Sequence, residues 1–230
     1  MLVLASASPR RQELLRNAGF TLVVQPTQVP ETPCEGELPR TFAERLAREK
    51  ALAVACQRPR DFVLGADTIV VVDAKILGKP SDAADAARML RLLSGRTHEV
   101  ITGVCLVGPS WRRAAQEPQG LKPGCSRNSS GTPEGVPFHN SLDETGVDNR
   151  KLETAFEDVR SEITLVTMYP LSECDIESYI ASGEPMDKAG SYGIQGIASR
   201  WIPRIEGDYC NVVGLPVALV CRMLREHGAI

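Results

Sequence analysis

Short apolar runs alternate with segments of helical periodicity along most of this chain, and small residues separate them. The first run, Leu2–Ala5, ends in small residues; Ser8-Pro9 follows, and apolar residues at helical spacing then continue to Gly19. This order predicts a strand, a tight turn and a helix. The same reasoning predicts helices over 41–56, 81–93, 171–180 and 212–225, and strands over 62–64, 69–72, 100–107, 163–168 and 202–205.

One segment interrupts the alternation. Between about Pro109 and Ala155, Pro, Gly, Ser and Asn recur, apolar periodicity disappears, and charges of both signs are mixed. Such a composition is typical of chain that buries little apolar surface. We therefore predict a flexible insertion at about 109–155 within a single domain spanning 1–230.

Charge and composition exclude several classes of function. With 26 basic and 29 acidic residues the net charge is -3, so the chain lacks the positive field that holds a nucleic acid polymer. Apolar runs stay well short of the ~18 residues that a membrane span requires, and no basic region precedes an apolar stretch at the N-terminus. We expect no membrane association and a cytoplasmic location. The seven cysteines lack a C-x-x-C pair and the three histidines are scattered, so reduced thiols and no structural zinc site are predicted.

Two arginines follow the predicted start of the first helix. Ser8 suits the N-cap and Pro9 the first helical position, but Arg10 and Arg11 place cations at the positive end of the helix dipole. Such side chains either extend into water or hold a multiply charged anion together with the free N–H groups of the first turn. Both interpretations remain open from these residues alone.

Lys50 lies on the apolar side of the second predicted helix, one turn from Leu46 and one from Val54. One interpretation is a lysine with a buried stem and a solvated ammonium. The other directs the ammonium into a cleft, toward phosphate.

The segment Gly65–Thr68 connects two apolar runs, and it carries Asp67. A carboxylate there is costly unless a cleft, a partner or a metal solvates it, although an aspartate that shapes a β-turn is the simpler alternative. We expect these residues in or between buried strands, with any chemistry at a strand end. Lys79 lies between Gly78 and Pro80, and the run Gly183–Gly190 likewise places small residues around charged ones. Such small residues are expected where the backbone must approach a ligand closely.

Seven segments, in this order and spacing, resemble the motifs of the Maf family, the septum-inhibition-type nucleotide pyrophosphatases. The resemblance extends over nearly the whole chain except the insertion, and seven ordered motifs are far more specific than any one of them. The segments are Leu4–Leu15, Leu46–Ala51, Gly65–Thr68, Gly78–Pro80, Leu93–Gly95, Asp187–Gly196 and Asn211–Pro216.

The resemblance implies an α/β fold with a mixed, strongly curved sheet, flanking helices and two lobes around a cleft, related to inosine-triphosphate pyrophosphatases. It also implies a homodimer and a divalent cation, Mg²⁺ or Mn²⁺. By position, Asp67 corresponds to the proton acceptor, and Arg10, Thr68 and Gln195 correspond to the residues that distinguish the dTTP/UTP subgroup. The residues expected to handle substrate are Ser8, Arg11, Glu31, Lys50, Lys79, Asp187 and Lys188.

The resemblance therefore predicts a nucleoside triphosphate pyrophosphatase that converts dTTP or UTP, and modified pyrimidine nucleotides, to monophosphate and pyrophosphate. Asp67 would take a proton from water or hold the metal, with Glu31 as the other metal candidate; the sequence does not separate these roles. Two alternatives stay open. One is a pyrophosphatase for 7-methyl-GTP or other modified nucleotides, and the other is a non-enzymatic nucleotide-binding regulator of cell division.

Overall fold

The structure is a computed structural model that describes residues 1–109 and 156–230. The predicted insertion at 109–155 therefore lies, except for its first residue, outside the described part of the chain. Among the described residues, no helix is both long and apolar enough to cross a membrane.

A mixed sheet of seven strands organises the molecule. Its strand order is β2-β1-β3-β5-β6-β7, and β4 also pairs with β3. Strand β1 runs parallel to β2 and β3, whereas the other pairs are antiparallel, which confirms the predicted mixed sheet. The strands are β1 Leu2–Leu4, β2 Leu22–Val24, β3 Phe62–Val72, β4 Lys75–Leu77, β5 Thr97–Val107, β6 Glu157–Thr167 and β7 Arg204–Glu206.

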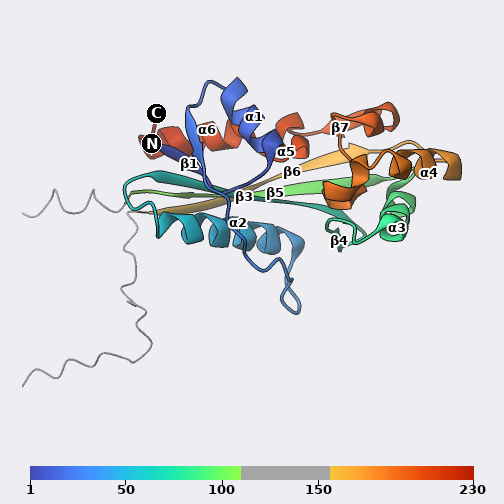
Figure 1. Ribbon diagram of the computed structural model, residues 1–230, viewed down its shortest axis with the longest axis horizontal. Helices are drawn as coiled ribbons and strands as arrows, with labels where there is room; N and C mark the ends of the chain where they lie inside the picture. The colour runs from blue at the N-terminus through green and yellow to red at the C-terminus, as the bar shows by residue number, and fades with distance from the viewer. Residues whose placement is uncertain (110–155) are drawn as a thin grey trace, which may run out of the picture.

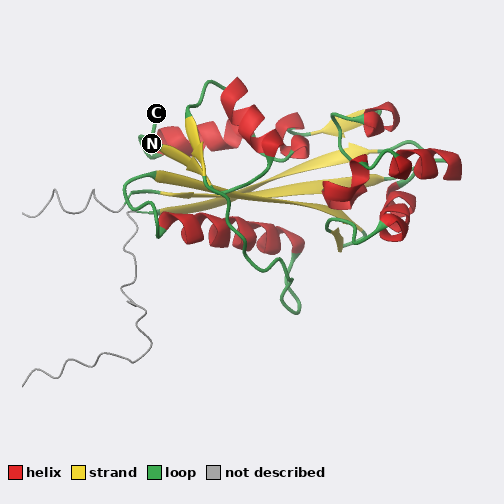
Figure 2. Ribbon diagram, viewed as in Figure 1, coloured by secondary structure: helices red, strands yellow, loops and turns green. Residues whose placement is uncertain are grey.

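Helices cover both faces and one end of this sheet. Helix α2 lies on one face, α1 and α6 lie on the opposite face, and α3 and α4 gather at the far end of the long strands (Figure 1). The helices are α1 Pro9–Asn17, α2 Pro39–Ala55, α3 Ala83–Leu93, α4 Glu173–Ala181, α5 Tyr209–Val213 and α6 Val217–Glu226, with 3₁₀ turns η2 Glu184–Asp187, η3 Ala189–Ser191 and η4 Ile197–Trp201. Figure 2 shows how the long central strands connect the two ends of the molecule. Each end has its own apolar core.

Helix α2 sits unusually close to the sheet because two glycines face it. A Cβ on Gly65 of β3 would lie 2.2 Å from the carbonyl oxygen of Ala47, and a Cβ on Gly103 of β5 would lie 2.3 Å from that of Ala43. Contacts that short are impossible, so only glycine fits at these two strand positions. The small residues of α2 complete the close packing. As a result, a side chain on α2 needs to extend only a short distance to contact β3.

Two sequence predictions about elements were wrong. The segment Gly65–Thr68 lies in a buried strand, which is one of the two predicted placements, but it is neither a turn nor a strand end, because β3 runs through it without interruption and pairs with β5 along this length. The predicted helix 212–225 is two helices, α5 and α6, separated at Gly214-Leu215-Pro216. Gly214 has a φ of 132°, which glycine tolerates and which ends α5, and Pro216 then caps α6.

Candidate active site

A cleft of about 1060 Å³ opens between the two ends of the molecule. It is lined by residues of α1, α2, β3, the loops before α2 and after β4, the 184–196 segment and the end of α5. All the side chains that the sequence singled out line it. These are Ser8, Arg10, Arg11, Glu31, Lys50, Asp67, Thr68, Lys79, Asp187, Lys188 and Gln195.

A buried ion pair lies at the floor of the cleft. The Nζ of Lys50 in α2 is 2.6 Å from Asp67 Oδ1 in β3 and 2.6 Å from Glu31 Oε1. The side chains of Lys50 and Asp67 are 11% and 10% exposed, whereas that of Glu31 is 52% exposed. Residues two apart on a strand share a face, so Asp67 faces α2 as Gly65 does, and the close α2 packing brings the ammonium within reach. The Lys50 ammonium is therefore paired inside the cleft and not solvated at the surface, whereas its contact with phosphate stays a prediction.

The two carboxylates differ in acidity. Burial raises the pKa of Asp67 above its ordinary value of 3.8, and the opposing charges of Lys50 and Arg11 do not outweigh it. Burial also tends to raise the pKa of Glu31, but the hydrogen bond and charge of Lys50, with the charges of Lys79 and Arg11, lower it overall. The two environments therefore shift the two pKa values in opposite directions: the cleft favours a protonated Asp67 and an ionised Glu31.

Arg11 is held in the cleft wall by a set of hydrogen bonds. Its Nε donates to the Gly214 carbonyl at 2.8 Å, its Nη1 to the Ala66 carbonyl at 2.8 Å and to Ser6 Oγ at 3.1 Å, and its Nη2 to Thr68 Oγ1 at 3.0 Å. A guanidinium has five N–H donors, so one donor remains for a ligand. Burial lowers the pKa of Arg11, although an arginine remains charged in proteins. Arg11 therefore supplies a fixed positive charge and a single directed N–H.

Two further positive features face the same space. Ser8 caps α1, where its Oγ accepts a hydrogen bond from the Arg11 backbone N–H at 3.5 Å, and Pro9 occupies the first helical position, as the sequence predicted. The side chain of Lys79, after β4, is exposed and forms no hydrogen bond or ion pair with residues 1–109 or 156–230. Its ammonium is free to contact an anion in the cleft.

Arg10 spans the cleft mouth. Its Nη1 is 3.2 Å from Asp187 Oδ2, so α1 contacts η2 although 177 residues separate the two side chains. Lys188 Nζ donates to the other oxygen of Asp187 at 2.8 Å and to the Glu184 carbonyl at 2.6 Å. The structure thus brings three predicted residues into one partly exposed charged cluster at the entrance.

Glu31 and Asp67 are the two metal candidates that the sequence suggests, and the structure brings them together. Both contact one cationic atom, Lys50 Nζ, so their oxygens converge on a single position. Within the described residues, no group of three or more His, Cys, Asp or Glu side chains is arranged to hold a metal. A site with two carboxylates suits Mg²⁺, which usually keeps several waters and takes further oxygen ligands from substrate phosphates.

Known proteins resemble this chain closely. The family model described as "Maf-like protein" matches residues 1–122 and 145–227. The chain belongs to the Maf family. A Maf relative from Koribacter versatilis, named dTTP/UTP pyrophosphatase, is 49% identical over 100% of this chain and 95% of its own length. Another with the same name, from Syntrophomonas wolfei, is 43% identical over 98% of this chain and 96% of its own length.

A solved structure also shows local similarity to this Maf chain. It is the nucleoside-triphosphatase, or dITP/XTP pyrophosphatase, of Mycobacterium abscessus, with 18% identity and a TM-score of 0.30 over 46% of this chain and 63% of that chain. A score this low carries no argument about the fold, which rests on the strand order and helices described above.

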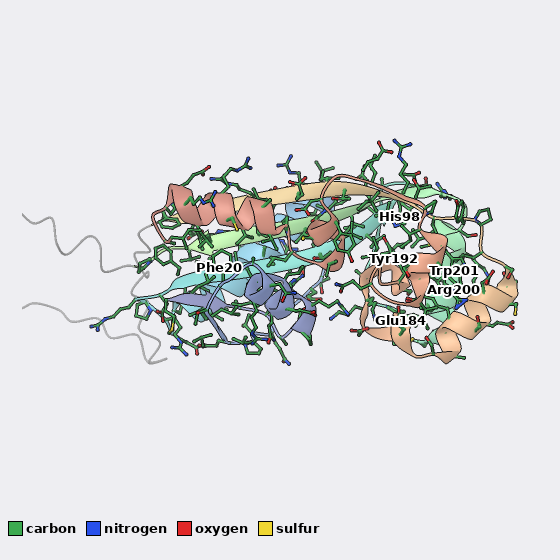
Figure 3. All side chains as sticks on the ribbon, turned by 90° about the horizontal axis from the view of Figure 1, so that it is seen from above. Phe20, His98, Glu184, Tyr192, Arg200 and Trp201 are labelled. Carbon is green, nitrogen blue, oxygen red and sulfur yellow. The ribbon has the colours of Figure 1, made fainter. Side chains whose placement is uncertain are left out.

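The wall that carries Gln195 includes residues that the sequence did not single out. Figure 3 shows Tyr192 beside His98, and Glu184 at the same end of the molecule, far from Phe20. Tyr192 lines the cleft, and its hydroxyl is 2.7 Å from Nε2 of His98, which burial keeps neutral by lowering its pKa to about 4. Glu184 accepts hydrogen bonds from the Tyr179 hydroxyl and the Ile197 backbone N–H.

These contacts fix the loop on both sides of Gln195, whose own side chain is exposed. No sequence pattern indicates this support, because the histidines are scattered and Glu184 lies 11 positions before the glutamine it supports.

Proposed function

We propose that this Maf-family chain hydrolyses dTTP and UTP, and modified pyrimidine nucleotides, to the monophosphate and pyrophosphate. The observation that carries the proposal is the buried carboxylate of Asp67 at the floor of a cleft lined by Lys50, Arg11 and Lys79. A base surrounded by cations is the arrangement that phosphoryl transfer to water needs. The two relatives described above, which align over nearly their full length, carry the name of this activity.

The reaction assigns a step to each of these groups. A water oxygen attacks the α-phosphorus, the bond from that phosphorus to the bridging α,β oxygen breaks, and pyrophosphate leaves with the bond electrons. Asp67 accepts the proton that the water loses, which its raised pKa favours. Lys50, Arg11 and Lys79 stabilise the negative charge on the triphosphate.

We propose a divalent cation, Mg²⁺ or Mn²⁺, as the cofactor, with Glu31 and Asp67 as the residues that would hold it. When bound, such an ion polarises phosphate oxygens and lowers the pKa of bound water. The fit rests on the convergence of the two carboxylates on one cation position. In this arrangement Lys50 would move from the carboxylates to the phosphates. Asp67 acts either as proton acceptor or as metal ligand, and both roles predict that its loss stops turnover.

Residues at the entrance and on the far wall of the cleft would select the nucleotide base. Gln195 offers an amide, which donates and accepts hydrogen bonds simultaneously and so suits a pyrimidine edge. Arg10, held by Asp187, lies at the cleft mouth. Thr68 bonds to Arg11, so it influences the pocket partly through that guanidinium. We further propose a homodimer and a cytoplasmic location, both of which follow from the family resemblance and the sequence.

The deciding experiment is a nucleotide panel on the full chain. dTTP, UTP, ATP, GTP and 7-methyl-GTP are each incubated with the protein and Mg²⁺ or Mn²⁺, and phosphate is measured with and without added inorganic pyrophosphatase. We expect phosphate only when the coupling enzyme is present, and the highest rates with dTTP and UTP.

Four results would contradict the proposal in different ways. Phosphate without the coupling enzyme would show that the wrong bond is cleaved. A panel led by 7-methyl-GTP would favour the other subgroup. Nucleotide binding without hydrolysis of any member would favour a regulator, and Asp67→Asn with the wild-type rate would show that observed hydrolysis does not come from this site.

A further inference from the structure

The Asn211–Pro216 motif connects the strands of the sheet to the wall of the cleft. Asn211 in α5 is fully buried, with 0% exposure. Its Nδ2 donates to the Val100 carbonyl in β5 at 3.0 Å and to Thr164 Oγ1 in β6 at 2.9 Å. One side-chain amide therefore fastens the five-residue helix α5 to two neighbouring strands.

The amide is a costly choice for packing alone. Asn211 Oδ1 is buried and has no hydrogen-bond partner among the described residues. An unsatisfied buried acceptor reduces stability, and an apolar side chain of similar size would avoid that loss. An apolar residue could not form the two hydrogen bonds that Nδ2 donates, so these bonds are what asparagine contributes at this position.

Those bonds fix the acceptor that orients Arg11. Three residues after Asn211, α5 ends at Gly214, whose carbonyl accepts from Arg11 Nε at 2.8 Å and from Thr68 Oγ1 at 3.2 Å. A Cβ on Gly214 would lie within 4 Å of both side chains, so the backbone passes directly against them. If α5 shifts, this carbonyl moves and the guanidinium loses its Nε contact.

A second connection leads from α5 to the same guanidinium. The Thr102 hydroxyl in β5 lies 3.3 Å from the Asn211 carbonyl and 2.9 Å from the Thr68 hydroxyl. Each hydroxyl has one proton, so Thr68 donates either to the Gly214 carbonyl or to Thr102, which then donates to Asn211; both routes lead to α5. Thr68 in turn accepts from Arg11 Nη2. Both ends of Arg11 thus depend on acceptors connected to α5, one through Gly214 and one through the two threonines.

We propose that Asn211 is a positioning residue for Arg11: it anchors α5 on β5 and β6, and so aims the remaining N–H of the guanidinium into the cleft. The proposal deepens the proposed function, because it takes Arg11 as a contact of the substrate phosphates. Asn211 itself is buried and does not touch substrate.

The first test measures positioning without any nucleotide. Hydrogen exchange at Arg11 Nε–H is followed by ¹⁵N NMR in the wild type, in Asn211→Ala and in Thr164→Val, which removes the hydroxyl that Asn211 contacts and preserves the side chain's shape. We expect exchange at least about tenfold faster in both variants. Ile176→Val, in the buried core at α4, serves as a destabilised control and should leave this exchange at the wild-type rate.

The second test is a double-mutant cycle with dTTP. We expect Asn211→Ala to raise KM about tenfold with little change in kcat, the size of effect seen within one hydrogen-bonded network. In an Arg11→Lys background, which retains the charge but cannot form the four-bond fork, the same substitution should change KM less than twofold. If Asn211→Ala does not fold, Thr164→Val takes its place in the cycle.

Unchanged Arg11 exchange in the folded variants, or a tenfold KM increase that persists in the Arg11→Lys background, would overturn the proposal. A wild-type protein without turnover would instead contradict the proposed function. The exchange measurement would still decide the role of Asn211 in that case.

Discussion

Two ion pairs in this protein have the same contact distance, but the pKa of the carboxylate is raised in one and lowered in the other. Lys50 and Asp67 meet at 2.6 Å in the cleft floor, and Arg91 and Glu173 meet at 2.6 Å on the surface between α3 and α4. The cleft pair is 11% and 10% exposed, whereas the surface pair is 53% and 63% exposed. The pKa of Asp67 is raised, but the hydrogen bond from Arg91 lowers the pKa of Glu173.

The difference shows that burial, not contact distance, sets the basicity of a paired carboxylate. Water solvates the ionised Glu173, and the hydrogen bond from Arg91 favours that ionised form further. Asp67 has lost its solvation by water, so its ionised form is less favourable. Because the folded-state pKa of Asp67 lies above its unfolded value of 3.8, its contribution to stability is greatest below that pH and is lost as the pH rises through the folded-state value. A carboxylate that is costly to ionise is a poor structural element and a good proton acceptor.

The largest expected effect comes from Asp67→Asn, which removes the basic carboxylate and keeps its size. General-base catalysis contributes ~10²–10⁴ in rate, so we expect kcat for dTTP to fall by about that factor. Nucleotide affinity, measured by calorimetry in the absence of divalent cation, should stay or increase, because Arg11 and Lys79 remain and a nearby negative charge is gone. Near-normal turnover per folded molecule would reduce Asp67 to a structural residue.

A smaller fall in kcat is expected when the distance between Lys50 and Asp67 is changed and their charges are kept. In Gly65→Ala the new Cβ would collide with α2 at Ala47, so the helix must move away from β3. Overpacking of this kind costs about 1–3 kcal/mol, and a displaced Lys50 should lower kcat by up to ~10²-fold.

Gly78→Ala, where a Cβ meets nothing within 4 Å, provides the control for unfolding. Its thermal midpoint should match the wild type, while that of Gly65→Ala should fall. Equal midpoints and equal rates for Gly65→Ala and the wild type would show that the close packing of α2 does not determine the position of Lys50 relative to Asp67.

Gln195→Glu should alter preference more than rate. The substitution replaces a donor and acceptor with an acceptor alone, at an exposed position. We expect the ratio of kcat/KM for dTTP over GTP to fall by about tenfold, within the range that single pocket contacts supply. An unchanged ratio across the nucleotide panel would remove Gln195 from base selection.

The smallest effect is expected at the surface pair. Exposed ion pairs contribute little because solvent and salt screen them, so Arg91→Gln should leave both turnover and the thermal midpoint at wild-type values. A marked loss in either quantity would show that the exposed Arg91–Glu173 pair contributes to activity or stability, contrary to this expectation.

The sequence supported much of the site because its motifs are local and ordered. The Ser8 cap, the lysine on the apolar side of α2 and the aspartate between apolar runs were all visible, and each lies in the cleft. The family assignment is confirmed by the family model and by the full-length relatives, and the predicted mixed α/β sheet is present. The catalytic and binding roles of the individual residues stay predictions.

What the sequence did not predict depends on contacts between distant segments. The continuity of β3 through Gly65–Thr68 follows from its pairing with β5, which no local pattern reveals. The break at Gly214 differs in that Gly214 and Pro216 are local signals for it; the apolar periodicity that runs across both helices favoured a single helix instead. The anchoring of α5 by Asn211, and of Tyr192 by His98, likewise joins residues about 50 to 111 positions apart in the chain.

A carboxyl-detected NMR titration of the nucleotide-free protein tests the central claim most directly. The side-chain carboxyl carbons of Asp67 and Glu173 are followed in one sample as the pH is lowered, with Asp67→Asn and Glu173→Gln used for assignment. We predict that Asp67 takes up its proton above the ordinary aspartate pKa of 3.8, and that Glu173 does so below the ordinary glutamate pKa of 4.5. An Asp67 pKa at or below 3.8 would contradict the account, because Lys50 would then outweigh burial and the cleft would lack its basic carboxylate.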